Sequence, residues 1–263
     1  MLGKLVKYDF KATGRTLLPL YGALIVLAII NKLFIGIKLD GANMDLLGGI
    51  PAFLSMFAYG CTMAAVFIVT LFVIVQRFYK NLLGDEGYLM NTLPVEVWKN
   101  IASKLIVGII WTIVSLIVAM ISIFIMVVTP AFLTDVVNVT PELFREISAE
   151  IGIEFVFILI KVALLVLTSI ISYILMLYVS ISIGQLFNKR KILASFGAFI
   201  VINMIVNTIM IIGQMAFFGV GSMFFDESIF IYLFEITIIL NLICSVIYFI
   251  VCNYILKNKL NLD

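Results

Sequence analysis

The chain has 263 residues, of which 64% are hydrophobic and 12% are charged, and its formal net charge is +2. Soluble domains are about half apolar and about a quarter charged, so this composition predicts one integral membrane domain over 1–263 and excludes a separate water-soluble domain. The absence of histidine excludes histidine metal sites, Ser-His-Asp triads and zinc-protease motifs.

The segment 1–16 predicts an amphipathic helix. At 3.6 residues per turn its apolar and basic side chains fall on opposite faces. The apolar face carries Leu2, Leu5, Val6 and Phe10, and the basic face carries Lys4, Lys7, Lys11 and Arg15. This pattern is typical of a helix in the membrane interface, with its basic side toward anionic headgroups. Asp9 falls within the apolar face, where it either pairs with a neighbouring lysine or meets a basic partner on another part of the protein.

Six long apolar runs follow, at 17–37, 52–76, 101–128, 154–186, 192–218 and 229–256. Each reaches the ~20 residues that a helix needs to cross the hydrocarbon core of a bilayer. No run alternates with the period of two that a membrane strand shows, so the prediction is an all-α protein with six transmembrane helices. Cys61, Cys244 and Cys252 all lie in these runs and are predicted to be buried free thiols.

Lysine and arginine placement predicts the orientation. With the N-terminus inside, the outer connections hold only Lys38 and Arg145. The cytoplasmic segments then hold Lys4, Lys7, Lys11, Arg15, Arg77, Lys80, Lys99, Lys104, Lys189, Arg190, Lys191, Lys257 and Lys259. Basic residues concentrate on the cytoplasmic side of membrane proteins, so both termini are predicted to be cytoplasmic.

The loop 77–104 is the longest polar interruption on the predicted cytoplasmic side. It combines acidic residues with closely spaced aromatic and apolar ones, which indicates either a docking surface or contact with the membrane surface. Gly84 and Gly87 supply breaks, and Pro94 with Glu96 predicts the start of a helix that continues through Lys104 into the third span. A short helical element before it would expose Asp85, Glu86, Tyr88 and Thr92.

In the outer connection 129–153, Thr140 followed by Pro141 predicts a short helix that leads into the fourth span. Three charged residues near the outer ends of spans are candidates for the rim of a substrate path: Glu154, Lys161 and Glu235. Lys161 shares a face with Glu154, which leaves open a local ion pair or snorkelling to the interface, and Glu235 could equally lie at the headgroup level.

Few polar residues lie within the spans. Asn203, Asn207 and Gln214 share one face of the fifth span and are the candidates for the lining of a path. Similar stripes occur on the fourth span (Ser169, Tyr173, Ser180) and on the third (Gly108, Thr112, Ser115, Ala119, Ser122). Small and hydroxyl side chains let helices approach and hydrogen-bond, so helix packing is the default interpretation of all three stripes.

The chain resembles permease subunits of ATP-binding-cassette type-2 exporters of Gram-positive bacteria. The resemblance rests on Lys7-Tyr8-Asp9-Phe10-Lys11, on the six spans with both ends inside, and on the loop 78–104. It implies an elbow helix at 1–16 and a coupling helix within 78–92 that docks in a groove of an ATPase subunit. The residues implied in this coupling are Tyr79, Asp85, Glu86, Gly87, Tyr88 and Thr92. The connection 219–228 is shorter than in many relatives, which puts a gating role for it in doubt.

The sequence contains no G-x-x-x-x-G-K-[ST] phosphate loop, so the chain is not expected to be an enzyme or to hold a cofactor. ATP and Mg²⁺ would bind a separate ATPase subunit. The other expected partners are a second permease copy or a related permease chain and the lipid bilayer, with no nucleic acid, in a bacterial plasma membrane. The alternatives are a non-transporting scaffold or immunity protein and an inverted-repeat secondary transporter. The substrate and the direction of transport stay open.

Overall fold

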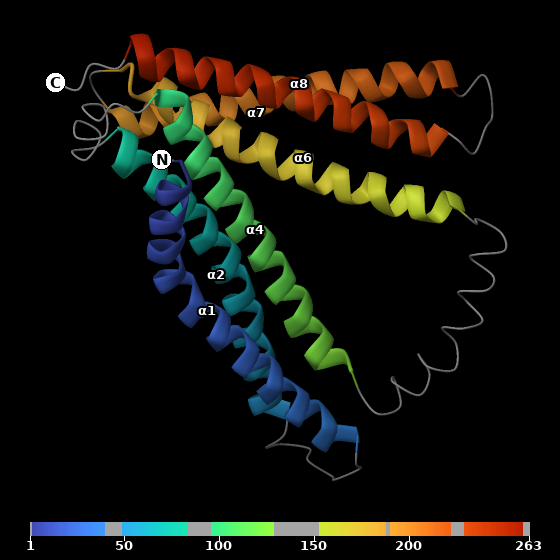
Figure 1. The fold of residues 1–263 in the computed structure, drawn as a ribbon. Coiled ribbons are helices and arrows are strands. Elements are labelled where there is room, and N and C mark those ends of the chain that lie inside the picture. Colours follow the sequence, from blue (N-terminus) through green and yellow to red (C-terminus); the bar gives the residue numbers. More distant parts are fainter. Residues whose placement is uncertain are drawn as a thin grey trace. The chain divides into compact units, whose positions relative to one another are not determined.

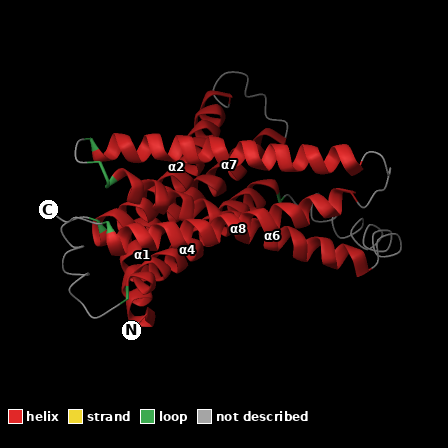
Figure 2. Ribbon diagram, turned by 90° about the horizontal axis from the view of Figure 1, so that it is seen from above, coloured by secondary structure: helices red, strands yellow, loops and turns green. Residues whose placement is uncertain are grey.

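The computed structural model describes residues 2–39, 49–83, 96–128, 153–187, 190–221 and 229–259. Within these ranges the regular structure is helical throughout (Figure 2). The helices are α1 (Leu2–Leu39), α2 (Gly49–Leu82), α4 (Val97–Val127), α6 (Ile153–Gly184), α7 (Lys191–Gly221) and α8 (Ile229–Asn258). All six are long and apolar enough to cross a membrane, which confirms the predicted number of spans and fits a multi-pass membrane protein.

Several helices extend beyond the apolar runs that predicted them, whereas α6 ends at Gly184, two residues before the predicted end of its run. The helices have 30 to 38 residues, and at 1.5 Å per residue even ~20 residues would cross the core. On either side of the loop predicted at 77–104, α2 continues to Leu82 and α4 already begins at Val97. Charged residues such as lysine are good helix formers, so a helix continues where its hydrophobic pattern stops. The intervening 84–95 lie outside the described residues, as does the helix predicted to start at Thr140.

α1 contains both the predicted interfacial segment 1–16 and the predicted first span 17–37. Pro19 lies inside this helix. A proline within a helix removes one backbone hydrogen bond and crowds the preceding turn, so Pro19 is where a change of direction would arise. An orientation of 1–16 along the membrane surface stays a prediction.

The chain divides into two compact units. The first, called the α6–α8 unit, comprises Met1–Leu2, Val75–Ile109 and Ser148–Asp263, and therefore also holds the end of α2 and the start of α4. The second, called the α1–α2–α4 unit, comprises Gly3–Ile74 and Ile110–Ile147.

In the α6–α8 unit, α6 is the central helix. It packs along α8 and α7, whereas α7 and α8 contact each other much less (Figure 1). The end of α2 also packs on α6, because the ring of Phe78 stacks on that of Tyr178 with 4.0 Å between centroids. Both side chains are fully buried.

In the α1–α2–α4 unit, hydroxyl groups join the three helices. The hydroxyl of Tyr21 on α1 and that of Thr70 on α2 are hydrogen-bonded to Ser115 Oγ of α4, at 2.7 and 2.9 Å. The Tyr59 hydroxyl of α2 is hydrogen-bonded to Ser122 Oγ at 2.9 Å. Ser115 and Ser122 belong to the stripe predicted on the third span, and both are buried. The helix-packing interpretation of that stripe is therefore confirmed for these two serines.

The three cysteines are free. Cys252 is buried and Cys244 is partly buried, but Cys61 is exposed on α2. The prediction of burial is therefore wrong for Cys61. An apolar run in a membrane helix faces either protein or lipid, and its composition does not distinguish the two sides.

Candidate ligand site among α6, α7 and α8

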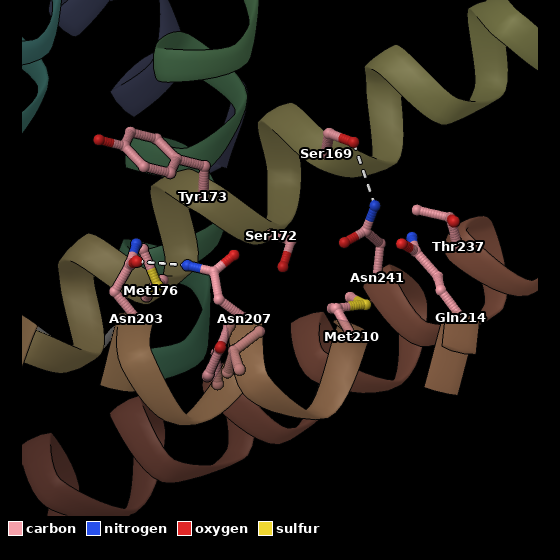
Figure 3. A pocket seen from close by; sticks show the side chains of 12 residues that line it. Ser169, Ser172, Tyr173, Met176, Asn203, Asn207, Met210, Gln214, Thr237 and Asn241 are labelled. Atoms are coloured by element: carbon pink, nitrogen blue, oxygen red, sulfur yellow. Dashed lines mark hydrogen bonds between the residues drawn. The ribbon is translucent and has the colours of Figure 1, made fainter. Parts of the chain in front are cut away.

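Polar side chains from α6, α7 and α8 line one cavity of about 280 Å³ in the α6–α8 unit (Figure 3). The lining residues are Ser169, Ser172, Tyr173 and Met176 of α6, Asn203, Val206, Asn207, Met210 and Gln214 of α7, and Thr237, Asn241 and Tyr248 of α8. Ser169, Asn207 and Asn241 each lie near the middle of their helix. A helix that spans a bilayer has its middle at the depth of the lipid tails, which is where spans of this length would place the cavity.

Helical periodicity brings these side chains together. Residues three, four, seven and eleven apart lie on one face of a helix. Asn203, Asn207 and Gln214 follow this spacing on α7, and the structure places all three at the cavity as a shared face predicts. Their role as the lining of a path stays a prediction, because a shared cavity says nothing of passage.

Two hydrogen bonds organise the polar groups. Asn241 Nδ2 donates to Ser169 Oγ at 3.1 Å and so links α8 to α6. Asn207 Nδ2 donates to Asn203 Oδ1 one turn earlier on α7. In Figure 3 the first bond crosses from α8 to α6, and the second lies along α7. An asparagine amide can donate twice and accept twice, so these contacts use only part of what the two amides offer.

The Tyr248 side chain is buried, and its hydroxyl has no nitrogen or oxygen hydrogen-bond partner among the described residues, which leaves the thiol of Cys244 as its partner. The thiol of Cys244 lies one turn earlier on α8, but a thiol is a weak partner. A buried hydroxyl with only a weak partner has lost its water contacts and gained little in return. Tyr248 lines the cavity, and a small shift of its ring would let this hydroxyl exchange the weak thiol contact for a stronger partner.

Sequence analysis missed the contribution of α8 to this site. Thr237, Asn241 and Ser245 recur at intervals of four along α8, which is the spacing of one helix face. This signal was present in the sequence. It could have indicated a polar face on the last span, although not that this face meets α6 and α7.

An ion pair joins α6 to α8 beside the cavity. Lys161 Nζ lies 2.6 Å from Glu235 Oε1, and the two side chains are 27% and 44% exposed. Both residues come near the starts of their helices. Two of the three predicted rim residues thus lie together, and the ion pair joins two different helices. The side chain of Glu154 lies outside the described residues.

The residues predicted to couple to an ATPase fall only partly within the described ranges. Tyr79, in the last turns of α2, is 38% exposed. Asp85, Glu86, Gly87, Tyr88 and Thr92 lie outside the described residues. Phe78, which helped to indicate a docking surface, is instead buried against Tyr178. Phe78, one of the closely spaced aromatic residues of the loop 77–104, therefore does not belong to a docking surface, because an aromatic pattern alone does not distinguish a surface residue from one that anchors α2 on α6.

The start of α4 carries a small exposed cluster. Glu96 directly precedes the helix, although it was predicted to lie within the first turn, and it suits the positive end of the helix dipole. Its carboxylate accepts hydrogen bonds from Lys99 Nζ at 2.8 Å and from the Trp98 indole at 2.6 Å. These two bonds, with that from Lys99 foremost, lower the pKa of Glu96 below the ordinary value of a glutamate. The cluster therefore keeps Glu96 ionised.

The fold and the cavity define a class: a multi-pass helical membrane protein with a polar site among three of its spans. Among the described lining residues none carries a charge. Elsewhere in the described ranges, no group of three or more histidine, cysteine or acidic residues is placed to hold a metal ion. Comparisons with protein-family models, with curated proteins and with solved structures found no match for this chain.

Proposed function

We propose that the chain is the membrane-spanning permease subunit of an ATP-binding-cassette exporter, driven by a separate ATPase subunit. The observation that carries the proposal is the polar cavity among α6, α7 and α8. Polar groups are costly at the depth of the lipid tails, and those that occur there mark functional positions by default. A protein that only anchored others in the membrane would have no need of such a site.

The proposed topology supports an ATPase on one side of the membrane. Six crossings return the chain to the side where it began, and the same side receives the connections α2–α4 and α6–α7. The helix ends on that side carry Lys80, Lys191 and Lys257. By the bias of basic residues this side is the cytoplasm of a bacterial plasma membrane. ATP and Mg²⁺ belong to the partner in this proposal, since the sequence carries no phosphate loop.

The end of α2 offers a mechanical route from the loop to the cavity. Phe78 leads into the loop and stacks on Tyr178 of α6. Tyr178 comes two residues after Met176, which lines the cavity. An ATPase that binds the loop and shifts the end of α2 would therefore move α6 relative to α7 and α8. Packed interfaces tend to switch between discrete arrangements, so this movement would open and close the site.

The test is a pull-down of the full chain from native membranes in mild detergent. The wild-type chain is expected to bring down an ATPase subunit. Glu86→Arg with Tyr88→Ala should weaken that complex about 30-fold, as expected for the loss of ~2 kcal/mol at an interface anchor. Glu150→Arg is the matched charge reversal in an outer connection and should change nothing.

A wild-type chain that captures no ATPase would refute the proposal. The non-transporting scaffold or immunity protein would then take its place. A second permease copy, or a related chain, is expected in the same complex, and it should be detected as a further membrane subunit alongside the ATPase.

A further inference from the structure

We propose that the cavity among α6, α7 and α8 binds the head of a neutral amphiphile, a molecule with two or more uncharged hydroxyl or amide groups on an apolar tail. The molecule would enter from the lipid side of the helices. This inference names the class of substrate for the proposed transporter and rests on that function for its meaning, although binding itself requires no ATPase.

The hydrogen-bonding groups of the cavity call for a ligand that both donates and accepts. Asn207 and Asn241 each keep a carbonyl oxygen and a second N–H beyond the bonds described above. Tyr248 adds a buried hydroxyl whose partner among the described side chains is the weakly bonding thiol of Cys244. A ligand hydroxyl can accept from an amide and donate to the next oxygen, so a head with several hydroxyls would satisfy these groups together.

Charge selects against ionic heads. No lysine, arginine, aspartate or glutamate is among the described residues that line the cavity. Glu235 comes two residues before Thr237, at the edge of the site, but its carboxylate pairs with Lys161 Nζ at 2.6 Å. The pair therefore presents no net charge to a ligand. A phosphate or ammonium group at this depth would lose its hydration without gaining a counter-ion, which is unfavourable.

The size of the cavity selects a head group and leaves the tail outside. Pockets that enclose a drug-sized molecule measure about 300–1,000 Å³, and this cavity of about 280 Å³ falls just below that range. Its Asn207 side is open, since this residue is exposed. Met204 and Ile211, one turn to either side of Asn207 on the same face of α7, are 66% and 54% exposed. An acyl chain can lie along them while its head occupies the cavity.

The experiment uses the purified full-length chain in phosphatidylcholine nanodiscs with a photoreactive monoacylglycerol as probe. Illumination should label peptides of α6, α7 or α8. Unlabelled monoacylglycerol should compete, whereas the same molecule with a phosphate on its head should compete at least about tenfold less well, because an uncompensated charge is unfavourable at this depth. Equal competition by the phosphate ester would overturn the assignment of a neutral head.

Variants test whether the cavity is the site. Asn207→Leu and Asn241→Leu should each reduce labelling about fivefold or more, as expected for a lost hydrogen bond of ordinary strength. Thr208→Val is the matched control on α7, because the Thr208 hydroxyl bonds the Met204 carbonyl of its own helix and does not line the cavity. Labelling that is unchanged in both asparagine variants overturns the proposal.

Tyr248→Phe separates ligand binding from folding. Removal of a buried hydroxyl that bonds only a thiol should leave unchanged or raise the thermal unfolding temperature of the protein without ligand, yet lower labelling by the monoacylglycerol. A structural role for Tyr248 would instead lower the unfolding temperature and leave labelling unchanged, which would count against the site. This variant keeps the test informative even where an asparagine variant folds poorly.

Two further outcomes are distinguishable. If a disulfide forms between two copies of Asn207→Cys, a second chain covers the mouth of the cavity, and lateral entry of a lipid is refuted. If no ATPase is captured but labelling follows the pattern above, the ligand site stands and only the proposed function fails. If an ATPase is captured but labelling fails, the function stands and the ligand class is wrong.

Discussion

Neutralising Lys161 alone should destabilise the α6–α8 unit, while neutralising both members of its ion pair should not. Lys161→Met leaves the Glu235 carboxylate within a span and without its 2.6 Å partner. Removing one member of a fully buried pair costs about 3–5 kcal/mol, and an exposed pair contributes at most about 1 kcal/mol. With side chains 27% and 44% exposed, an intermediate loss of about 2 kcal/mol is expected for either single variant.

The assay is reversible unfolding in mixtures of dodecyl maltoside and sodium dodecyl sulfate. Lys161→Met and Glu235→Gln are measured singly and together as a double-mutant cycle. The double variant should lie within about 1 kcal/mol of wild type, since no uncompensated charge remains. The exchanged pair, Lys161→Glu with Glu235→Lys, should keep most of the stability because the two charges still meet.

A matched control is Lys257→Met, which removes the same charge from an exposed position at the end of α8. It should change the free energy of unfolding by no more than about 0.5 kcal/mol. The reasoning is refuted if the effects of the two single variants simply add, with a coupling below about 0.5 kcal/mol. The ion pair would then contribute nothing to the contact between α6 and α8.

Three other changes test the packing and the topology. Phe78→Ala should cost about 3–5 kcal/mol of unfolding free energy in the same assay. Tyr79→Ala, at a partly exposed position, should cost less than about 1 kcal/mol. Equal effects would mean that the stack of Phe78 on Tyr178 does not hold α2 on α6. Gly184→Ala should cost about 1–3 kcal/mol, because its Cβ would come within 2.6 Å of the backbone nitrogen of Ser195, and a wild-type unfolding curve would contradict this close approach. Cysteines introduced at Lys80 and Arg190, beside basic helix ends, should be shielded from an impermeant thiol reagent in intact cells. Cysteines introduced at Asp45 and Glu146, in outer connections, should react. The reverse pattern would invert the topology.

The sequence predicted much of the local structure because the bilayer constrains it. A run of apolar residues that crosses the hydrocarbon core must be helical, since a helix satisfies its own backbone hydrogen bonds. The number of spans and the shared face of Asn203, Asn207 and Gln214 follow from run length and from 3.6 residues per turn. The end of α2 was predicted less well, because hydropathy reports transfer into lipid while α2 continues beyond its apolar run to Leu82. The continuation of α4 through Lys104 was predicted from Pro94 and Glu96.

Only the tertiary structure decided which helix faces meet. Lys161 shares a helix face with Glu154, but the sequence gives no sign that it also pairs with Glu235 on α8, as it does in the structure. The cavity arises because α6 lies against both α7 and α8 at matching heights, which brings Ser169 to Asn241. Helix association in a membrane depends on close packing and on hydrogen bonds, since lipid tails are as apolar as the helix surfaces. A one-dimensional pattern records the faces of each helix but not the energies that select their neighbours.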